Sequence, residues 1–170
     1  NTNFFAFADT VSATNYAKTI PGDGWLGVRF QKSPDSPPND LVIHVKMLDN
    51  DNRLQQQAVG ILGVNLLYAC FFLSDDMDVM LQSLNDGLHN RVMIDMIRLN
   101  GPSFKDVDNR ALSFKLVKLG LSDVAMFDAN GTNIHPSEFL YKKNVLLVRG
   151  AFRPITYASY DIIRSSHEQF

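Results

Sequence analysis

Residues 41–73, LVIHVKMLDNDNRLQQQAVGILGVNLLYACFFL, hold the pattern that decides the fold. Residues 41–47 are rich in apolar and β-branched side chains and predict a strand. Asp51 or Asn52 can cap a helix over residues 53–73, whose first turn is polar and whose remainder is apolar almost all round. A helix that is apolar on all sides is buried, so this pair of elements predicts a sheet covered by helices.

The same patterns continue on both sides of this stretch. Residues 25–31 (WLGVRFQ) predict a strand that forms a hairpin with 41–47 across the proline-rich loop 33–39. Further strands are predicted at 91–99, 124–127, 132–134 and 144–149, the last a nearly all-apolar central strand. Helices are predicted at 4–18, 75–84, 108–119, 136–142 and 161–166. We therefore expect an α/β fold with a mixed central sheet of about five to seven strands and helices packed on it.

Composition limits the class of protein. The chain has 170 residues, 45% of them apolar and 20% charged, which predicts a single globular domain over residues 1–170. The net charge of −2 argues against nucleic-acid binding and offers no polybasic patch for a membrane surface. The apolar run 58–73 is shorter than the roughly 17–25 residues that span a bilayer, so we expect no membrane segment.

The single cysteine, Cys70, lies within that apolar run and predicts a buried, inert thiol. One cysteine and no signal peptide favour a reducing compartment, so we expect a cytoplasmic location. The chain starts at Asn1 without a methionine and ends at Phe170 in a polar stretch. We therefore expect it to be a fragment of a longer polypeptide.

Six ordered blocks support a resemblance. They are WLGVRFQ, PNDLVIHVKMLD, QQQAVGILGVNLLYA, IDMIRLNGPSF, DNRALSFKLVKLGL and PSEFLYKKNVLLVRGAFRPIT. They resemble an uncharacterised bacterial family of longer cytoplasmic proteins, whose members often carry the labels "TonB-dependent receptor" or "nicotinamide-nucleotide adenylyltransferase". The resemblance implies no established activity.

Neither label agrees with the residues. A TonB-dependent receptor is a membrane barrel of lipid-facing strands, whereas this chain predicts several core helices. Residues 148–156 (VRGAFRPIT) match the nucleotidyltransferase motif G-x-F-D-P-x-[HT]-x-G-H at Gly150, Phe152, Pro154 and Thr156. Arg153 replaces the motif's Asp, and Ala158-Ser159 replace its Gly-His. We therefore expect no nucleotidyl transfer.

Arginines supply the candidate ligand site. Arg149 and Arg153 follow the predicted central strand 144–149, and the carboxyl ends of strands in open α/β sheets bind ligands. Arg110 begins a predicted helix, where it can clamp an anion or merely accompany a capping Asp108. Ser137 and Glu138 add polar groups. Together these residues predict a site for a phosphorylated or carboxylated small molecule; surface arginines are the alternative.

Other polar residues carry weaker signals. His44 alternates with apolar neighbours on its strand and could act as a base, but the four histidines show no metal-ligand spacing, so we predict neither a metal nor a cofactor. Asp95 and Arg98 are predicted on opposite faces of one strand, and Asp95 to be in a structural ion pair. Residues 127–132 (FDANGT) loosely resemble a phosphatase motif with Asp128 as nucleophile, but Asn130-Gly131 favours a hairpin turn.

Two functions stay open. The first is a non-catalytic ligand-binding or assembly domain of a bacterial cytoplasmic protein, contacting another copy of itself or the rest of a longer chain. The alternative is an enzyme or binding site for the anionic small molecule above. The residues do not decide whether the protein is an enzyme, because no nucleophile, base and orienting group come together in the sequence.

Overall fold

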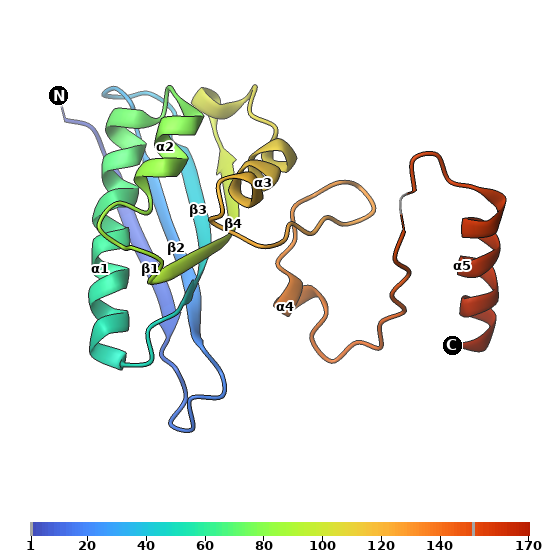
Figure 1. Cartoon of the computed structure of the whole chain (residues 1–170). Coiled ribbons are helices and arrows are strands. Elements are labelled where there is room, and N and C mark those ends of the chain that lie inside the picture. Colours follow the sequence, from blue (N-terminus) through green and yellow to red (C-terminus); the bar gives the residue numbers. More distant parts are fainter. Residues whose placement is uncertain (1, 151) are drawn as a thin grey trace. The chain divides into compact units, whose positions relative to one another are not determined.

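The computed structural model describes residues 2–150 and 152–170 and divides into two compact units, which meet in sequence at His135 and Pro136. The first unit contains a sheet with helices, and the second contains two helices joined by a long connection (Figure 1). An α/β fold is therefore confirmed for the first unit, and each unit is described by itself.

The sheet has four strands in sequence order, each antiparallel to its neighbour: β1 (Phe5–Ser12), β2 (Gly22–Phe30), β3 (Asn39–Met47) and β4 (Val92–Asn100). The prediction of five to seven strands in a mixed sheet is wrong for the described residues. A mixed sheet needs at least one pair of parallel strands, which a helix usually connects. Here the helices between β3 and β4 connect two antiparallel neighbours instead.

The first strand corrects the predicted helix at residues 4–18. Phe4, Phe7 and Val11 occur at helical spacing, but Phe5, Phe7 and Val11 also fit the alternation of a strand. Pairing with β2 over eight residues decides for the strand. The ladder supplies backbone partners that the short apolar pattern could not reveal, so tertiary context overrides local periodicity.

One face of the sheet is covered by helices. Helix α1 (Asn52–Tyr68) begins at Asp51, whose carboxylate accepts hydrogen bonds from the backbone N–H groups of Arg53 and Leu54, and it continues into a π-helical turn, η1 (Ala69–Leu73). Helix α2 (Met77–Ser83) follows and lies on the same side of the sheet (Figure 1). The shared core includes Leu26, Val28, Phe30, Leu41, Ile43, Val45, Ala58, Leu62, Leu66, Met80, Leu81, Ile97 and Leu99.

Residues 52–73 are long and apolar enough to cross a membrane by length and composition alone. In this fold, the helix instead packs on the sheet through Ala58, Leu62 and Leu66, which are fully buried. A core helix of a folded domain passes the same test, so this single segment is weak evidence for a membrane span.

The two edges of the sheet differ. Helix α3 (Asn109–Lys118) lies beside β4, and the Asn109 side-chain amide pairs with both the N–H and the C=O of Leu99, at 2.8 and 3.0 Å. The backbone of Leu121 accepts a further bond from Ile94. No described segment pairs with the outer edge of β1. The β4 edge is thus capped by its own chain, whereas the β1 edge is open to another strand.

Glycine is required where β1 and β2 approach each other. A Cβ at Gly24 would lie 2.3 Å from the backbone oxygen of Thr10, whereas a Cβ at Gly27 would meet nothing closer than 3.7 Å. We expect Gly24→Ala to lower the free energy of unfolding by about 1–3 kcal/mol, the usual cost of overpacking. Gly27→Ala, in the same strand, should change it little. Urea denaturation of both variants compares them, and equal midpoints would contradict the packing described.

The single cysteine is buried in η1, as predicted, and burial raises the pKa of the Cys70 thiol to about 12. Since only the thiolate reacts with disulfide reagents, we expect the native protein at pH 8 to resist modification by dithionitrobenzoate. The denatured protein should react with one equivalent. Rapid reaction of the native protein would show that the helix does not bury this residue.

The segment that closes the first unit forms a turn rather than a pair of strands. Phe127 and Asn133 form an isolated bridge, so the predicted strands 124–127 and 132–134 reduce to that one pairing. The Asp128 carboxylate accepts hydrogen bonds from the backbone N–H groups of Asn130 and Thr132, and the bond from Thr132 helps to lower the pKa of Asp128. These contacts favour the turn interpretation of FDANGT over a nucleophile.

The second unit corrects a further prediction. It contains α4 (Pro136–Phe139) and α5 (Tyr157–Gln169), and residues 144–149 between them form no strand. Most of these residues are exposed, including Leu147. An apolar run predicts a central strand only if other strands flank it, and all four strands of the described chain belong to the first unit.

Candidate functional site

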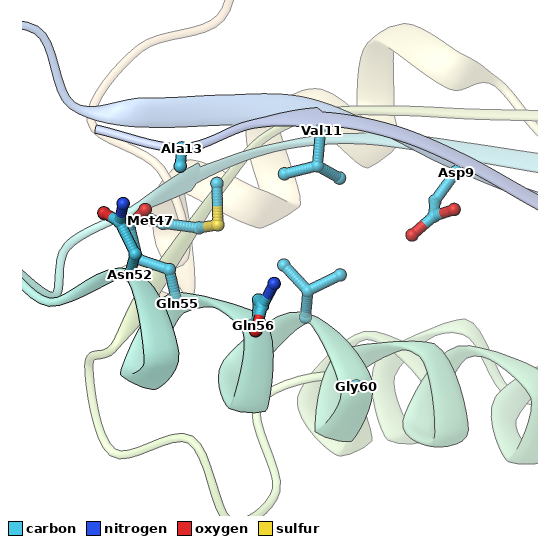
Figure 2. Close-up of a pocket in the computed structure, with 9 residues that line it drawn as sticks. Asp9, Val11, Ala13, Met47, Asn52, Gln55, Gln56 and Gly60 are labelled. Atoms are coloured by element: carbon cyan, nitrogen blue, oxygen red, sulfur yellow. The ribbon is translucent and has the colours of Figure 1, made fainter. Parts of the chain in front are cut away.

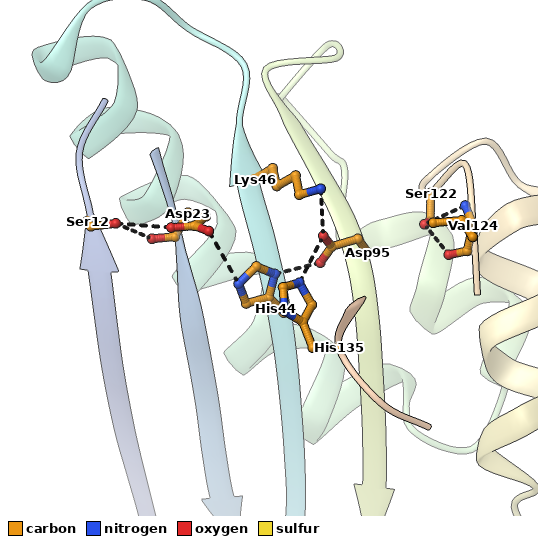
Figure 3. Close-up of polar contacts among 8 residues, drawn as sticks. All are labelled: Ser12, Asp23, His44, Lys46, Asp95, Ser122, Val124 and His135. Carbon is orange, nitrogen blue, oxygen red and sulfur yellow. Dashed lines mark hydrogen bonds and ion pairs between the residues drawn. The ribbon is translucent and has the colours of Figure 1, made fainter. Parts of the chain in front are cut away.

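A polar cluster lies on the sheet face opposite α1, and a β-bulge creates it. His44 pairs with Met96 and Val45 pairs with Ile94, which leaves Asp95 as the extra residue of β4. The Asp95 side chain lies on the face that carries His44 (Figure 3), and the extra residue moves the residues that follow it to the opposite face from the one that strict alternation gives. Arg98, opposite Val42, lies on that face too, so the prediction that Asp95 and Arg98 occupy opposite faces is wrong.

Two imidazoles share the Asp95 carboxylate. His44 Nδ1 lies 2.6 Å from Oδ1, and His135 Nε2 lies 3.3 Å from Oδ2. The side chains of His44, Asp95 and His135 are only 4, 4 and 2% exposed. Asp95 thus has two histidines as its close hydrogen-bond partners, and the structural ion pair predicted for it is found with Lys46. We call these three side chains the His–Asp–His cluster.

Aromatic packing holds the two rings. Their centroids are 3.7 Å apart, and the Trp25 ring lies edge-on to both, at 4.8 Å from His44 and 5.7 Å from His135. Three chain segments thus fix the rings: β2, β3 and the loop that ends the first unit. Such support from neighbouring side chains is what fixes the geometry of a binding site.

The charge of Asp95 is retained despite its burial. Burial alone would raise the pKa of this carboxyl, but the hydrogen bond and charge of His44, followed by those of His135, outweigh it and lower the pKa below its usual value. Lys46 adds a cation, with Nζ 3.5 Å from Oδ2. Asp95 is therefore an anionic acceptor at neutral pH.

A second carboxylate connects the cluster to the surface. Asp23 Oδ2 lies 4.0 Å from His44 Nε2, and Asp23 Oδ1 accepts a 3.0 Å hydrogen bond from the Ser12 hydroxyl (Figure 3). The side chains of Asp23 and Lys46 are 40 and 37% exposed. Asp23 and Lys46 thus connect the buried cluster to side chains that solvent reaches.

The cluster also contains an unsatisfied atom. His135 Nδ1 is buried and has no hydrogen-bond partner in the described structure. The neighbouring Asn133 contributes another such atom, its Oδ1, although its Nδ2 donates to the Ser113 hydroxyl at 2.6 Å. A buried polar atom without a partner is costly, and it marks a place where a bound group can contribute.

Two hollows lie elsewhere on the first unit. One, of about 330 Å³, lies between β1 and α1, with Asp9 at one end and Val11 and Gln55 within it (Figure 2). Gln55 already bonds to Thr14 and to the Asp49 carbonyl, so its polar groups are satisfied.

The other hollow, of about 430 Å³, lies over Gly27 and Val42 near Arg98. Its Arg29 and Asp40 neutralise each other through two bonds of 2.7 and 2.9 Å, and Arg29 lowers the pKa of Asp40. Neither hollow offers the orphaned buried nitrogen of the His–Asp–His cluster.

The ligand residues predicted from sequence lie in two different units. Arg110 begins α3 in the first unit and pairs with Asp108, the residue that caps that helix, at 3.3 Å. The other four lie in the second unit: Ser137 and Glu138 in α4, and Arg149 and Arg153 in the connection to α5. Arg149 no longer follows a strand, which removes the reason for placing it at a ligand site. Convergence of these five residues stays a prediction.

Sequence reasoning named His44 and Asp95 but did not connect them with His135. The three are separated by 51 and 40 positions, far beyond any local metal-ligand or catalytic spacing. The available signal was a polar residue between apolar neighbours in each of two strands, His44 in LVIHVKM and Asp95 in RVMIDMIRL.

Comparison with protein-family models, with curated proteins and with solved structures finds no match to this chain.

Proposed function

We propose that the first unit is a non-catalytic ligand-binding domain and that the His–Asp–His cluster is its binding site. The observation that carries this proposal is the buried, unpartnered Nδ1 of His135 beside an anionic carboxylate. Leaving a buried polar atom unpaired costs about 1–3 kcal/mol, and a ligand that used it would recover that cost on binding. Buried polar clusters of this kind are tolerated where they serve binding.

The surroundings of His44 support binding rather than covalent catalysis. A catalytic nucleophile is held within hydrogen-bond reach of its base. The nearby hydroxyl, Ser12, instead donates to Asp23, and within the described residues the hydrogen bonds of His44 and His135 go to Asp95. The one thiol, Cys70, belongs to the core beneath the opposite face of the sheet.

A ligand screen tests the proposal. Thermal unfolding of the chain should be followed with divalent metals, nucleotides and sugar phosphates. A ligand at 100 times its Kd adds about 2.7 kcal/mol of stability, a shift that is easily measured. The stabilisation should disappear in Asp95→Asn and persist in Asp35→Asn, a matched change in the exposed β2–β3 loop. Stabilisation that survives Asp95→Asn would place the ligand elsewhere, for example at the predicted arginines.

Assembly is a second candidate function, favoured by a specific surface. Val64, Tyr68 and Phe72 follow one another at helical spacing along the outer side of α1 and η1, and Val64 and Phe72 are 66 and 70% exposed. Exposed apolar stripes of this kind mark contacts with other protein surfaces. We propose that this stripe contacts another copy of the chain or the remainder of a longer polypeptide.

Sedimentation velocity tests the assembly proposal. The unmodified chain should associate as its concentration rises, and Val64→Lys with Phe72→Lys should shift it to monomer without lowering its thermal stability. Replacement of an exposed side chain outside this stripe, such as Lys105→Ala, should leave association unchanged. A monomer at every concentration would contradict self-association.

We also propose a cytoplasmic location, in a bacterial protein longer than this chain. The buried free thiol supports it, because reducing compartments keep cysteines unpaired. Fractionation of cells that express the full-length protein is the direct measurement. Recovery in the membrane or periplasmic fraction would contradict this location.

A further inference from the structure

We propose that the ligand of the His–Asp–His cluster is a single first-row divalent transition-metal ion of the Zn²⁺ class, held by His44, Asp95 and His135. This inference rests on the proposed function and names the ligand of the same site. Each of the three side chains offers one ligand atom, and these atoms all lie within 4.8 Å of one another. Two imidazole nitrogens and one carboxylate oxygen form a donor set that Zn²⁺ and its neighbours accept.

The distances are close to those of a coordinated ion. Zn²⁺ binds nitrogen and oxygen at roughly 2.0–2.2 Å, so two ligand atoms on a tetrahedral ion lie about 3.3 Å apart. His135 Nε2 and Asp95 Oδ2 are already 3.3 Å apart. His44 Nδ1 is hydrogen-bonded at 2.6 Å to the other carboxylate oxygen, Oδ1. This hydrogen bond must open for His44 to bind the ion together with Asp95.

A carboxylate lies on the other side of the His44 ring. In the metal-free cluster, His44 Nδ1 is hydrogen-bonded to Asp95 Oδ1. Coordination through Nδ1 needs that nitrogen free of hydrogen, which leaves the N–H of the ring on Nε2, facing Asp23 Oδ2 at 4.0 Å. A carboxylate behind a metal-bound histidine is the usual outer partner that fixes its tautomer. Asp23 is therefore a positioning residue for the metal site rather than a ligand.

One ring nitrogen of His135 forms no hydrogen bond in the described structure. Its Nδ1 is buried without a partner, and its hydrogen bond in the described structure is the 3.3 Å contact of Nε2 with Asp95. Exchanging the Asp95 contact for a bond to the ion therefore breaks no other hydrogen bond of His135 in the described structure. The unpartnered nitrogen distinguishes this cluster from a purely structural one, in which every buried polar atom forms a hydrogen bond within the protein.

Lys46 competes with the ion. Its ammonium lies 3.5 Å from the same Oδ2 that a metal would take, and like charges at this distance repel. The side chain is 37% exposed, so it can swing into solvent when the ion enters. The site thus predicts an unusual result: removing Lys46 should strengthen metal binding, whereas removing a structural contact would weaken it or have no effect.

Calorimetric titration of the chelator-treated, dialysed chain with ZnCl₂ tests the inference. We expect one ion per chain with a Kd below about 10 μM. Binding should weaken at least tenfold in Asp95→Asn, weaken about tenfold in Asp23→Asn through the loss of the outer partner, and strengthen at least threefold in Lys46→Met. Asp35→Asn is the matched control and should bind like the unmodified chain. Co²⁺ should give the intense visible absorption of a tetrahedral site. Mg²⁺ should not bind at the concentrations that saturate the site with Zn²⁺.

The outcomes separate the inference from the proposed function. Absence of Zn²⁺ binding, or equal binding by the unmodified chain and Asp95→Asn, overturns the metal inference. If a nucleotide or sugar phosphate then stabilises the chain in an Asp95-dependent way, the ligand-binding function stands with another ligand. If nothing binds, both are wrong. Because Lys46→Met alters a partly exposed side chain, the direction of its effect decides the question even if Asp95→Asn folds poorly.

Discussion

Replacing Asp95 by alanine is expected to lower the free energy of unfolding by about 2–5 kcal/mol in the absence of any ligand. The change leaves His44 Nδ1 and His135 Nε2 without their acceptor, and each buried donor left unsatisfied costs about 1–3 kcal/mol. It also frees the segment that ends the first unit from one of its attachments to the sheet. Asp95 is thus expected to matter for stability as well as for binding.

Urea unfolding followed by tryptophan fluorescence measures this effect directly. Trp25 is the only tryptophan and lies against both imidazole rings, so its emission reports on the cluster itself. The matched control is Asp23→Ala, since that carboxylate is 40% exposed and should cost no more than about 1 kcal/mol. Equal midpoints for the two variants would mean that Asp95 is not the anchor of the cluster.

Replacing Phe30 by alanine is expected to cost about 3–5 kcal/mol, the usual range for deleting a buried aromatic ring. Phe30 is fully buried, and its ring packs against Phe71 of η1 at 5.5 Å and against Phe104 at 6.2 Å. It therefore joins the sheet, the long helix and the segment after β4. A cavity at this position cannot close without moving all three.

The control for this prediction is Phe114→Ala on α3. That ring is 61% exposed and contacts Phe127 at the surface, so its removal should cost about 1 kcal/mol or less. Thermal and urea unfolding of both variants give the comparison. A Phe30 variant as stable as the Phe114 variant would contradict the packing of η1 on the sheet.

Much of the first unit could be predicted from the sequence because its signals are local. The apolar alternation of residues 25–31 and 41–47 predicted β2 and β3, and the capping residues Asp51 and Asp108 marked the starts of α1 and α3. These elements carry their own period and their own start signals. Long, strongly patterned segments of this kind do not need a partner to be recognised.

The wrong predictions concern segments whose structure depends on pairing with a strand elsewhere in the chain. Phe4, Phe7 and Val11 fit both a helix and a strand, and only the edge of β2 selects the strand. The run 144–149 is apolar enough for a central strand, but the described sheet ends at β1 and β4. Neither fact is written in the local sequence, because the free energy of pairing comes from residues elsewhere in the chain.

The candidate site was hidden for a related reason. The bulge at Asp95 shifts the residues that follow it, so that Arg98 lies on the same face as Asp95, and strict alternation along RVMIDMIRL cannot reveal an extra residue. His135 reaches the cluster from a loop 40 positions beyond Asp95. The sequence shows which side chains can bind a ligand. It does not show that they meet, because their meeting depends on the bulge at Asp95 and on the loop that carries His135.

Anomalous diffraction at the zinc absorption edge tests the central claim most directly. Crystals of the chain grown with one equivalent of ZnCl₂ are expected to show one strong anomalous peak, within about 2.2 Å of nitrogen atoms of His44 and His135 and an oxygen of Asp95. Crystals of Asp95→Asn should lack it. A map with no peak in the cluster, or with peaks only at exposed histidines such as His89, would contradict the account.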